Sequence, residues 1–482
     1  MMEYPCIEIF KTPNNNYVFD ANRNKFMFIS DGTYEYLHEI LRDKSDRALE
    51  IPEEIYDLKS SGFLAEKSSV EEVRHAYSPY LDYFLQRKLS RITLQLTQEC
   101  NFRCKYCIYS EESNARQRNH SHQHMDWQTA KKAVDFLWRH SVDSNRINIG
   151  FYGGEPLLEI TLIKKIVDYA KVLFEGKKLT FSMTTNGSLL TDEIIKYLEE
   201  QDVILMISLD GPKEINDLNR VFANGSGTYE TVIGRIRNLE KLAPQYAKKL
   251  SISMVMDPRN DFDCFNSICL DGTELESLNF YPALVDKEFD STSVLLSDEY
   301  RLKYNYQRFL ALLSFFNRFP RNEVSPILNR TITSIATDCE KIEENTGFFP
   351  IDAPSGPCIP GQLRLFVNVF GQLFPCERVS EKSNPMCIGT IEKGFDTSKA
   401  LRLLNVGELT KEACKECWCF RYCSLCAKKA DDGSNKLSAE KKMSYCKESR
   451  VAAYDKLSIY LLIKEAKEFY NQQLVQQNGG EH

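Results

Sequence analysis

Short apolar runs alternate with amphipathic stretches through the middle of the chain. The apolar runs are rich in β-branched residues and are bounded by turn-forming residues, which favours strands. Between them, apolar residues recur every three to four positions, the period of a helix with one buried face. The expected strands are residues 92–97, 146–152, 179–185, 203–209, 250–256 and 278–284, and the clearest helices are residues 126–142, 158–174 and 228–243.

This alternation predicts an α/β fold in which six parallel β/α units form a partial (β/α)6 barrel of the TIM type. Barrels of this kind carry their active sites at the C-terminal ends of the strands. The N-terminal part predicts a small α+β unit, with two short strands in YVFDANRNKFMFIS followed by helices. The expected units are an N-terminal domain at 1–75, a linker at 76–90, the barrel at 91–297, a helical bridge at 298–357, an irregular cysteine-rich domain at 358–450 with a hairpin at 363–376, and a C-terminal helix and tail at 451–482.

Composition and charge narrow the class of protein. The chain has 482 residues, of which 43% are apolar and 27% charged, and its formal charge is −7. The negative charge argues against nucleic acid or an anionic membrane as a partner. No apolar run is long enough to span a membrane, and the N-terminus lacks the pattern of a signal peptide. We therefore expect a cytoplasmic protein.

The 16 cysteines are too many and too clustered for a cytoplasmic chain without metal. One tight group lies after the first expected barrel strand, and most of the others fall between Cys358 and Cys446. Four cysteines stand apart and are interpreted as small buried hydrophobic residues. These are Cys6, Cys264, Cys269 and Cys339.

The first group has the spacing Cys100-x3-Cys104-x2-Cys107. A [4Fe–4S] cluster normally takes four thiolates, so three cysteines would leave one iron open to another ligand. The alternative is a zinc site, because this spacing supplies three of the four ligands that zinc needs. A histidine could complete it, and three follow the group. They are His120, His122 and His124.

This loop resembles the signature of the radical SAM superfamily, C-x3-C-x-aromatic-C, with Tyr106 at the aromatic position. The resemblance implies that S-adenosylmethionine (SAM) binds the open iron and is cleaved to a 5′-deoxyadenosyl radical. The ends of the next three strands resemble further elements of the family. The SAM-binding residues so implied are Tyr106, Gly153, Gly154, Glu155, Pro156, Thr185, Asn186, Ser208, Asp210 and Arg220.

The later cysteines resemble the SPASM extension of peptide-modifying radical SAM enzymes. By this resemblance one auxiliary cluster is held by Cys414, Cys417, Cys423 and Cys446, and the other by Cys358, Cys376 and Cys426. The chain departs from the common pattern, because two residues separate Cys423 from Cys426 where three are usual. The second auxiliary cluster lacks a fourth ligand, which could be Cys387, Cys419, Cys339 or a substrate thiolate. The alternative is a zinc ribbon on the four cysteines from Cys414 to Cys426.

The N-terminal unit resembles the winged-helix-like element with which maturases of ribosomally made peptides bind a leader peptide, by adding it as a strand to a sheet edge. Together with the segments around Cys358 and Cys376, this implies an oxidoreductase that forms thioether crosslinks in a cysteine-rich precursor peptide. Three [4Fe–4S] clusters, SAM and a reductant such as flavodoxin or ferredoxin are implied. The sequence identifies no catalytic side chain.

Several alternatives stay open at this point. Formylglycine formation in sulfatases uses the same core and extension, and so do carbon–carbon crosslinking and epimerisation of peptides. A non-enzymatic alternative is a zinc-binding scaffold for peptides.

Overall fold

The computed structural model describes most of the chain. The described residues are 6–43, 50–65, 68–107, 109, 120–269, 275, 278–285, 297–339, 342 and 347–478, and the side chains of residues 43, 339 and 471–478 lie outside the description. The side chain of Cys339 and the last four residues, for which a ligand role and a tail were expected, thus lie outside the described residues.

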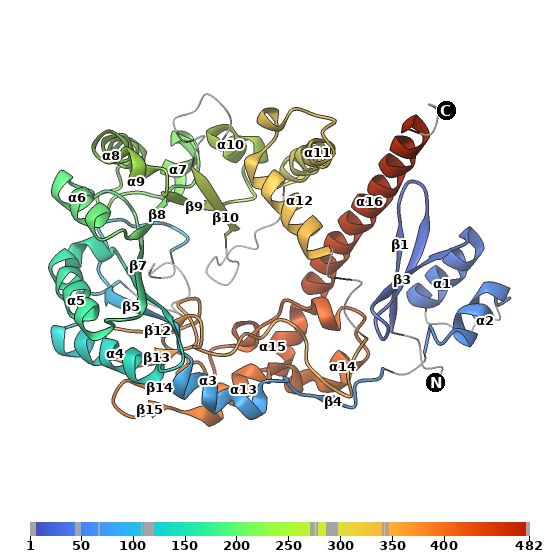
Figure 1. Cartoon of the computed structure of the whole chain (residues 1–482), viewed down its shortest axis with the longest axis horizontal. Coiled ribbons are helices and arrows are strands. Elements are labelled where there is room, and N and C mark those ends of the chain that lie inside the picture. The colour runs from blue at the N-terminus through green and yellow to red at the C-terminus, as the bar shows by residue number, and fades with distance from the viewer. Residues whose placement is uncertain are drawn as a thin grey trace.

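Six parallel strands pair in chain order and form a curved open sheet (Figure 1). Their positions confirm the six strands expected from the sequence. The strands are β5 (Arg91–Thr97), β6 (Arg146–Gly153), β7 (Lys178–Thr185), β8 (Ile204–Ser208), β9 (Ser251–Met256) and β10 (Asn279–Leu284).

Helices cover the outer side of this sheet (Figure 1). Their apolar faces are buried against the strands; in α4, for example, Ala130, Val134 and Leu137 are buried, and Asp126 caps the helix by accepting the backbone N–H of Thr129. The helices are α4 (Trp127–His140), α5 (Ile160–Leu173), α6 (Asp192–Glu200), α7 (Lys213–Asn219), α8 (Tyr229–Leu242), α9 (Pro244–Ala247) and α10 (Phe262–Asn266).

The cysteine-rich segment continues the same sheet. The expected hairpin is confirmed as β12 (Leu365–Val367) and β13 (Gln372–Phe374), and β12 also pairs in parallel with β5. This continuation was not expected from the sequence. Two short strands follow, β14 (Gly389–Thr390) and β15 (Gly394–Phe395), which extend the sheet to ten strands.

The N-terminal unit has three antiparallel strands rather than the two expected. The additional strand is β1 (Ile7–Lys11), and the others are β2 (Asn16–Asp20) and β3 (Lys25–Ile29). The strands are followed by α1 (Asp31–Asp43) and α2 (Glu53–Ser60), as expected.

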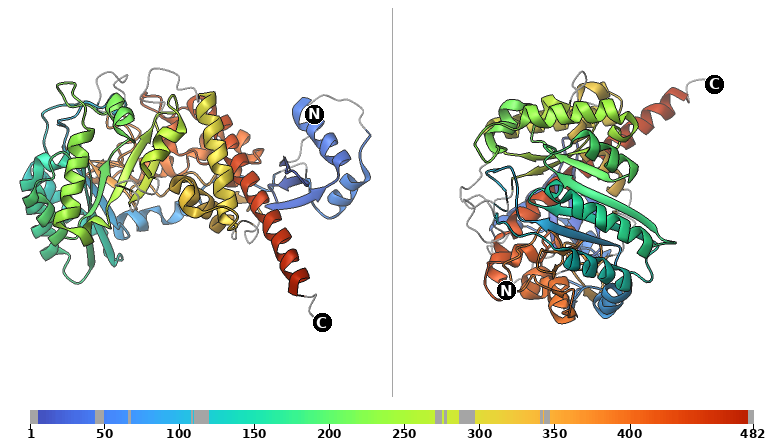
Figure 2. Two further views of the ribbon diagram at one scale, coloured as in Figure 1. Left: turned by 90° about the horizontal axis from the view of Figure 1, so that it is seen from above. Right: turned by 90° about the vertical axis from the view of Figure 1, so that its left-hand side faces the viewer.

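A long C-terminal helix, α16 (Cys446–Asn478), packs beside the N-terminal strands (Figure 1). The rings of Phe10 and Tyr454 stack at 4.6 Å between centroids. Glu465 accepts hydrogen bonds from the Thr12 hydroxyl at 2.7 Å and the Tyr17 hydroxyl at 2.8 Å. The N-terminal unit is thus docked on the C-terminal end of the chain, and Figure 2 shows the two side by side from a second direction.

The linker expected at 76–90 is instead part of the folded core. It contains α3 (Leu81–Arg87), because Leu81, Leu85 and Leu89 recur at helical spacing and are fully buried.

The remaining α-helices and strands are β4 (Glu72–Val73), α11 (Asp298–Phe315), α12 (Pro326–Cys339), β11 (Ile351–Asp352), α13 (Thr397–Leu404), α14 (Lys411–Lys415) and α15 (Ala439–Ser444). None of the helices among the described residues is long and apolar enough to cross a membrane.

Candidate active site

The cysteine loop that follows β5 lies directly against the end of β6. The backbone N–H of Gly154 donates to the carbonyl of Thr97 at 2.8 Å, and that of Glu155 donates to the carbonyl of Glu99 at 2.9 Å. A Cβ at Gly153 would overlap the Thr97 carbonyl, and one at Gly154 would overlap the Glu99 carbonyl. Because glycine has no Cβ, the backbone at these two positions can approach the backbone of residues 97–99 closely, which places the start of the cysteine loop beside the end of the neighbouring strand.

The three cysteines of this loop lie within electrostatic range of one another. The backbone N–H of Cys107 donates to the carbonyl of Cys104 at 3.0 Å, which turns the loop back on itself. Burial raises the pKa of Cys100 and of Cys104 to about 12, so both are neutral thiols in the chain alone. Binding to iron would release these protons, because a metal ligand must be a thiolate.

Two N–H groups point at the sulfur of Cys100. They are the backbone N–H of Phe102 at 3.4 Å and the side-chain amide of Asn186 at 3.8 Å. Hydrogen bonds to cluster sulfurs are one of the means by which proteins tune iron–sulfur clusters. The three grouped cysteines and these donors fit a [4Fe–4S] cluster with one open iron. Among the described residues, no three or more His, Cys, Asp or Glu side chains are arranged to hold a single metal ion.

Glu155 connects the ends of β6 and β7. It is fully buried, and its carboxylate accepts the Thr185 hydroxyl at 2.7 Å, the Asn186 N–H at 2.8 Å and the Leu157 N–H at 3.0 Å. Burial raises its pKa, and these three donors oppose that shift. The contact expected between Glu155 and the ammonium group of SAM stays a prediction, as does the role of Pro156, which begins a short 3-10 helix.

Asn186 belongs to a ring of side-chain hydrogen bonds at the end of β7. Its amide donates to Asn101 at 2.8 Å, Asn101 donates to the Ser188 hydroxyl at 2.9 Å, and that hydroxyl donates back to Asn186 at 2.7 Å. Asn101 was missed in the sequence, although its place directly after Cys100 was a usable signal. The ring fixes the cysteine loop to the segment expected to contact SAM.

A second buried network joins Tyr106, Asp210 and Arg220. The Tyr106 hydroxyl donates to Asp210 and accepts from Arg220 at 2.8 Å, and Asp210 also accepts the backbone N–H of Val255 at 3.0 Å. Burial raises the pKa of Asp210. The structure thus brings these three expected SAM-binding residues together. Ser208 ends β8 and is partly exposed. The SAM contacts of Ser208, Tyr106, Asp210 and Arg220 all stay predictions.

The three histidines after the loop have other partners. His124 lies 2.6 Å from Glu159 and 3.4 Å from Glu99, while His122 is exposed and lies 3.5 Å from Glu99. The ring of His120 stacks on Tyr109. Burial lowers the pKa of His120 to about 4.

The distal cysteines lie close together in two groups. Cys358 lies near enough to Cys376 and Cys426 for them to raise its pKa, and Cys446 lies near enough to Cys414, Cys417 and Cys423 for the same effect. Cys426 thus lies with Cys358 and Cys376, which disfavours the zinc ribbon. The two ligand sets implied by the resemblance stay predictions. Trp418, which lies between Cys417 and Cys419 in the sequence, packs edge-on against Phe10.

The candidates for a fourth ligand differ in their surroundings. Cys387 directs its S–H at the carbonyl of Gly389, 3.5 Å away. Cys419 is buried and interacts with Cys417 and Cys423, which belong to the group that contains Cys414 and Cys446.

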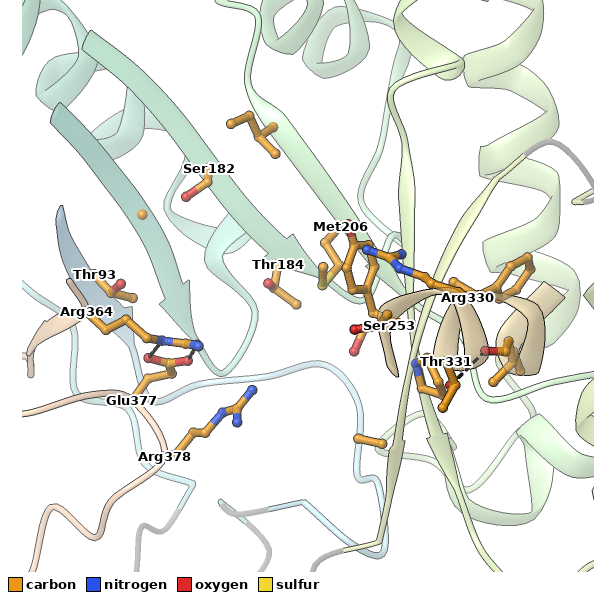
Figure 3. Close-up of a pocket in the computed structure, with 18 of the residues that line it drawn as sticks. Thr93, Ser182, Thr184, Met206, Ser253, Arg330, Thr331, Arg364, Glu377 and Arg378 are labelled. Atoms are coloured by element: carbon orange, nitrogen blue, oxygen red, sulfur yellow. Dashed lines mark hydrogen bonds and ion pairs between the residues drawn. The ribbon is translucent and has the colours of Figure 1, made fainter. Parts of the chain in front are cut away.

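A cavity of about 940 Å³ opens on the inner side of the six parallel strands (Figure 3). Tyr152 and Thr184 line it and directly precede the segments at the ends of β6 and β7 that are expected to contact SAM. On another side it is lined by Arg364, which lies within electrostatic range of Cys358 and Cys376. The cavity therefore runs from the ends of β6 and β7, which contact the first cysteine loop, toward the distal cysteines.

The residues that line this cavity were not expected from the sequence. The usable signal was polar residues at every second position of otherwise buried strands, such as Ser182 and Thr184 in β7 and Asn148 in β6.

Comparison with known proteins agrees with this geometry. Residues 94–267 match the model of the Radical SAM superfamily. The chain is 24% identical over 378 residues to a cysteine-type anaerobic sulfatase-maturating enzyme of Clostridium perfringens, which covers 74% of this chain and 93% of that protein. It is 28% identical over 206 residues to the radical SAM cyclopropyl synthase TigE of Paramaledivibacter caminithermalis, which covers 41% of this chain and 42% of that protein.

The solved structure of anSMEcpe with bound AdoMet superposes with a TM-score of 0.55 at 22% identity, covering 78% of this chain and 99% of that one. This likeness shows a shared fold. Over several curated relatives, TigE among them, the chain spans less than half of the relative's length.

Proposed function

We propose that this chain, which carries a radical SAM domain at residues 94–267, crosslinks a cysteine sulfur of a ribosomally made peptide to a carbon of another residue. The reaction would take place in the cavity between the two cysteine sites. We interpret the six parallel strands as the partial barrel, and residues 358–450 as the SPASM domain with two auxiliary clusters.

The position of the cavity carries this proposal. Thioether formation removes one hydrogen atom from the acceptor carbon, one proton from the thiol and one electron. SAM and the cluster that Cys100, Cys104 and Cys107 would hold would supply the radical chemistry that takes up the hydrogen atom, and the auxiliary cluster that Cys358, Cys376 and Cys426 would hold would supply an acceptor for the electron. A substrate must therefore contact both sites, and the cavity extends from Thr184 at one to Arg364 at the other.

The chain's own residues would position the reactants. The side-chain ring of Asn101, Asn186 and Ser188 holds the cysteine loop against the SAM segment. The strands form one wall of the cavity, which would shield the acceptor carbon from part of the bulk water and so protect a radical from side reactions. Cys358, Cys376 and Cys426 would hold the nearer auxiliary cluster.

We propose that this nearer cluster keeps one iron open for the substrate thiolate. The direction of Cys387 toward Gly389, and the position of Cys419 beside Cys417, support an open iron over a fourth cysteine of the chain. A thiolate bound to iron stays deprotonated and ready for bond formation.

The N-terminal unit would bind the leader of the precursor peptide. β3 lies at the edge of its sheet and pairs with β2 on one side. Phe28 on this strand is 63% exposed, which offers an apolar contact next to an open row of backbone groups. A leader added as a fourth strand would contact the Phe28 side chain and pair with the backbone groups of β3. Because this unit packs on α16, the core peptide would then emerge close to the rest of the enzyme.

Formylglycine formation is the second candidate, because the sulfatase-maturating enzyme of Clostridium perfringens aligns over 74% of this chain. The two reactions give different products. A thioether consumes a thiol and leaves no carbonyl group, whereas formylglycine is an aldehyde that reacts with a hydrazide.

The test is anaerobic reconstitution with SAM, a reductant such as flavodoxin or ferredoxin, and a cysteine-rich peptide encoded beside the gene. We expect about 12 irons per chain, the total for three four-iron clusters. The peptide should lose two hydrogens per bridge and resist thiol alkylation. A hydrazide-reactive peptide would assign the second candidate, and release of 5′-deoxyadenosine with an unchanged peptide would contradict both.

A further inference from the structure

The cavity is strongly cationic, although the chain as a whole carries a formal charge of −7. Its lining contains six basic side chains and three acidic ones. The basic residues are Arg91, Arg308, Arg330, Arg364, Arg378 and Lys456, and the acidic residues are Glu377, Asp338 and Asp455. The excess of positive charge is therefore a local property of this site.

Each acidic residue is already paired with a basic one. Glu377 forms an ion pair with Arg364, and Figure 3 shows the two side chains facing each other. Asp455 lies 2.5 Å from Arg308, and Asp338 lies 2.8 Å from Lys456.

Within the part of the chain that the structure describes, the guanidinium groups of Arg91, Arg330 and Arg378 form no ion pair, and an Nη of Arg91 donates to the Ser182 hydroxyl at 3.4 Å. The Nε of Arg91 is buried and has no hydrogen-bond partner within the described part of the chain. Arg330 lies over the ring of Tyr281, 4.3 Å from its centroid, and Arg378 extends from the opposite side toward the open space (Figure 3).

Arg91 and Arg378 also lie within electrostatic range of Arg364. Three like charges therefore meet at one wall, where Arg364 is paired with Glu377 and also lies near the thiols of Cys358 and Cys376. Such an arrangement is unfavourable in the empty site and becomes favourable when an anion enters. Guanidinium groups bind carboxylates in two-pronged geometry, and with greater strength than neutral donors do.

We propose that Arg91 and Arg378, on the wall that also carries Arg364, bind a carboxylate of the peptide substrate and so select acidic sequences around the reacting residue, while Arg330 adds positive charge from across the cavity. This inference rests on the proposed function, because it takes the occupant of the cavity to be a peptide. The carboxylate can belong to an Asp or Glu side chain or to the C-terminus of the peptide. Its binding beside Arg364 would place the neighbouring peptide residue close to the Cys358, Cys376 and Cys426 site.

The experiment measures binding to the holoenzyme with SAM and without reductant, so that no turnover occurs. The probes are fluorescein-labelled decapeptides with one cysteine and, next to it, Asp, Asn or Lys, all amidated at the C-terminus. A fourth probe has Asn and a free C-terminal carboxylate. Fluorescence anisotropy gives the dissociation constant of each probe for the parent enzyme and its variants.

We expect the Asp peptide to bind about tenfold tighter than the Asn peptide, and the Lys peptide to bind weakest. Arg378→Gln should abolish this preference and Arg378→Lys should retain part of it. Arg139→Gln is the matched control, because Arg139 lies exposed on α4 outside the cavity, and it should leave the preference intact. If the Asp side chain and the free C-terminus raise the affinity equally over the amidated Asn peptide, the site accepts a carboxylate from either source. If only one of them raises the affinity, that one is the source of the carboxylate.

Two results would overturn the inference. One is equal binding of the Asp, Asn and Lys probes to the parent enzyme. The other is a loss of SAM affinity in Arg378→Gln with an unchanged peptide preference, which would assign the arginines to the carboxylate of SAM. If the acidic preference holds but reductant yields no crosslink in any cysteine peptide, the carboxylate site stands and the proposed reaction fails.

Discussion

The carboxylate of Glu155 accepts the backbone N–H of Asn186 at 2.8 Å, and this contact joins the ends of two neighbouring strands. Glu155 belongs to the turn after β6, and Asn186 follows β7. The same Asn186 donates its side-chain amide toward Cys100. One buried carboxylate therefore sets the position of a residue that reaches the cysteine loop.

Replacing Glu155 with Gln should weaken both the fold and SAM binding. The amide nitrogen of Gln is a donor, so at least one of the three N–H or O–H groups that now face the carboxylate would lose its acceptor. An unsatisfied buried donor costs about 1–3 kcal/mol. Thermal unfolding and calorimetric SAM titration measure the two effects, and Glu193→Gln, on the exposed face of α6, is the control. A variant with full SAM affinity would contradict the positioning role.

Replacing Cys104 with Ala should abolish SAM cleavage and lower the iron content by about four per chain. Burial and the neighbouring cysteines place this sulfur in the first group, and Ala cannot ligate iron. Iron analysis and chromatography of 5′-deoxyadenosine measure the outcome. Cys264→Ala is the matched control, since Cys264 lies in α10 apart from the cysteine groups, and it should retain both iron and cleavage. SAM cleavage by Cys104→Ala would refute the first site.

Replacing Cys426 with Ala should separate the two halves of the proposed reaction. The auxiliary cluster would be lost, so iron falls by about four and crosslinking stops, while SAM cleavage continues at the first site. Cys387→Ala is the comparison, because its sulfur faces Gly389. It should keep the full iron content and the crosslinking activity. Loss of the cluster in Cys387→Ala would instead make Cys387 the fourth ligand.

Replacing Phe28 with Asp should weaken binding of the leader peptide by about tenfold and leave SAM cleavage unchanged. The change puts a charge where an apolar contact is expected at the edge of β3, and the side chain is exposed, so the fold should persist. Titration of a labelled leader peptide measures the effect. Tyr56→Asp, at an exposed position of α2, is the control. Unaltered leader binding would place the leader elsewhere.

Protonation of His140 should make the protein less stable in mild acid. Burial lowers the pKa of His140 below its usual value near 6.5, so the unfolded chain binds the proton more tightly than the folded one. Stability is therefore fully present above pH 6.5 and is lost as the pH falls from there toward the folded pKa. Urea unfolding from pH 7.5 to 5.5 should show a shallower loss for His140→Gln than for the parent. His38→Gln, at an exposed position, should match the parent slope.

Much of the parallel sheet could be predicted because its pattern is local. Each expected strand corresponds to one of β5 to β10 within a residue or two, since the apolar runs are bounded by turn residues. The additional strand β1 was missed although its partner β2 follows after a turn of four residues and has the same length. The pairing of β12 with β5 was missed because residues more than 270 positions apart in sequence form it.

The site was predicted less completely than the fold. The cysteines carry their chemistry in their spacing, so their grouping could be expected before the structure. The partners of Glu155 and Asp210 could not, since those carboxylates are engaged by residues on other strands. Arg91, Arg330 and Arg378 are also dispersed over β5, α12 and the segment after β13, and only folding brings them into one cavity.

The pairing of β12 with β5 has a practical consequence for anyone who wishes to study the metal sites separately. Cys100 follows one of these strands closely, and Cys376 follows the hairpin partner of the other. A truncation between the six parallel strands and the cysteine-rich region would leave unpaired strand edges on both fragments, and such edges promote aggregation. Spectra of the individual clusters are therefore better obtained by deleting their cysteines in the intact polypeptide than by truncation.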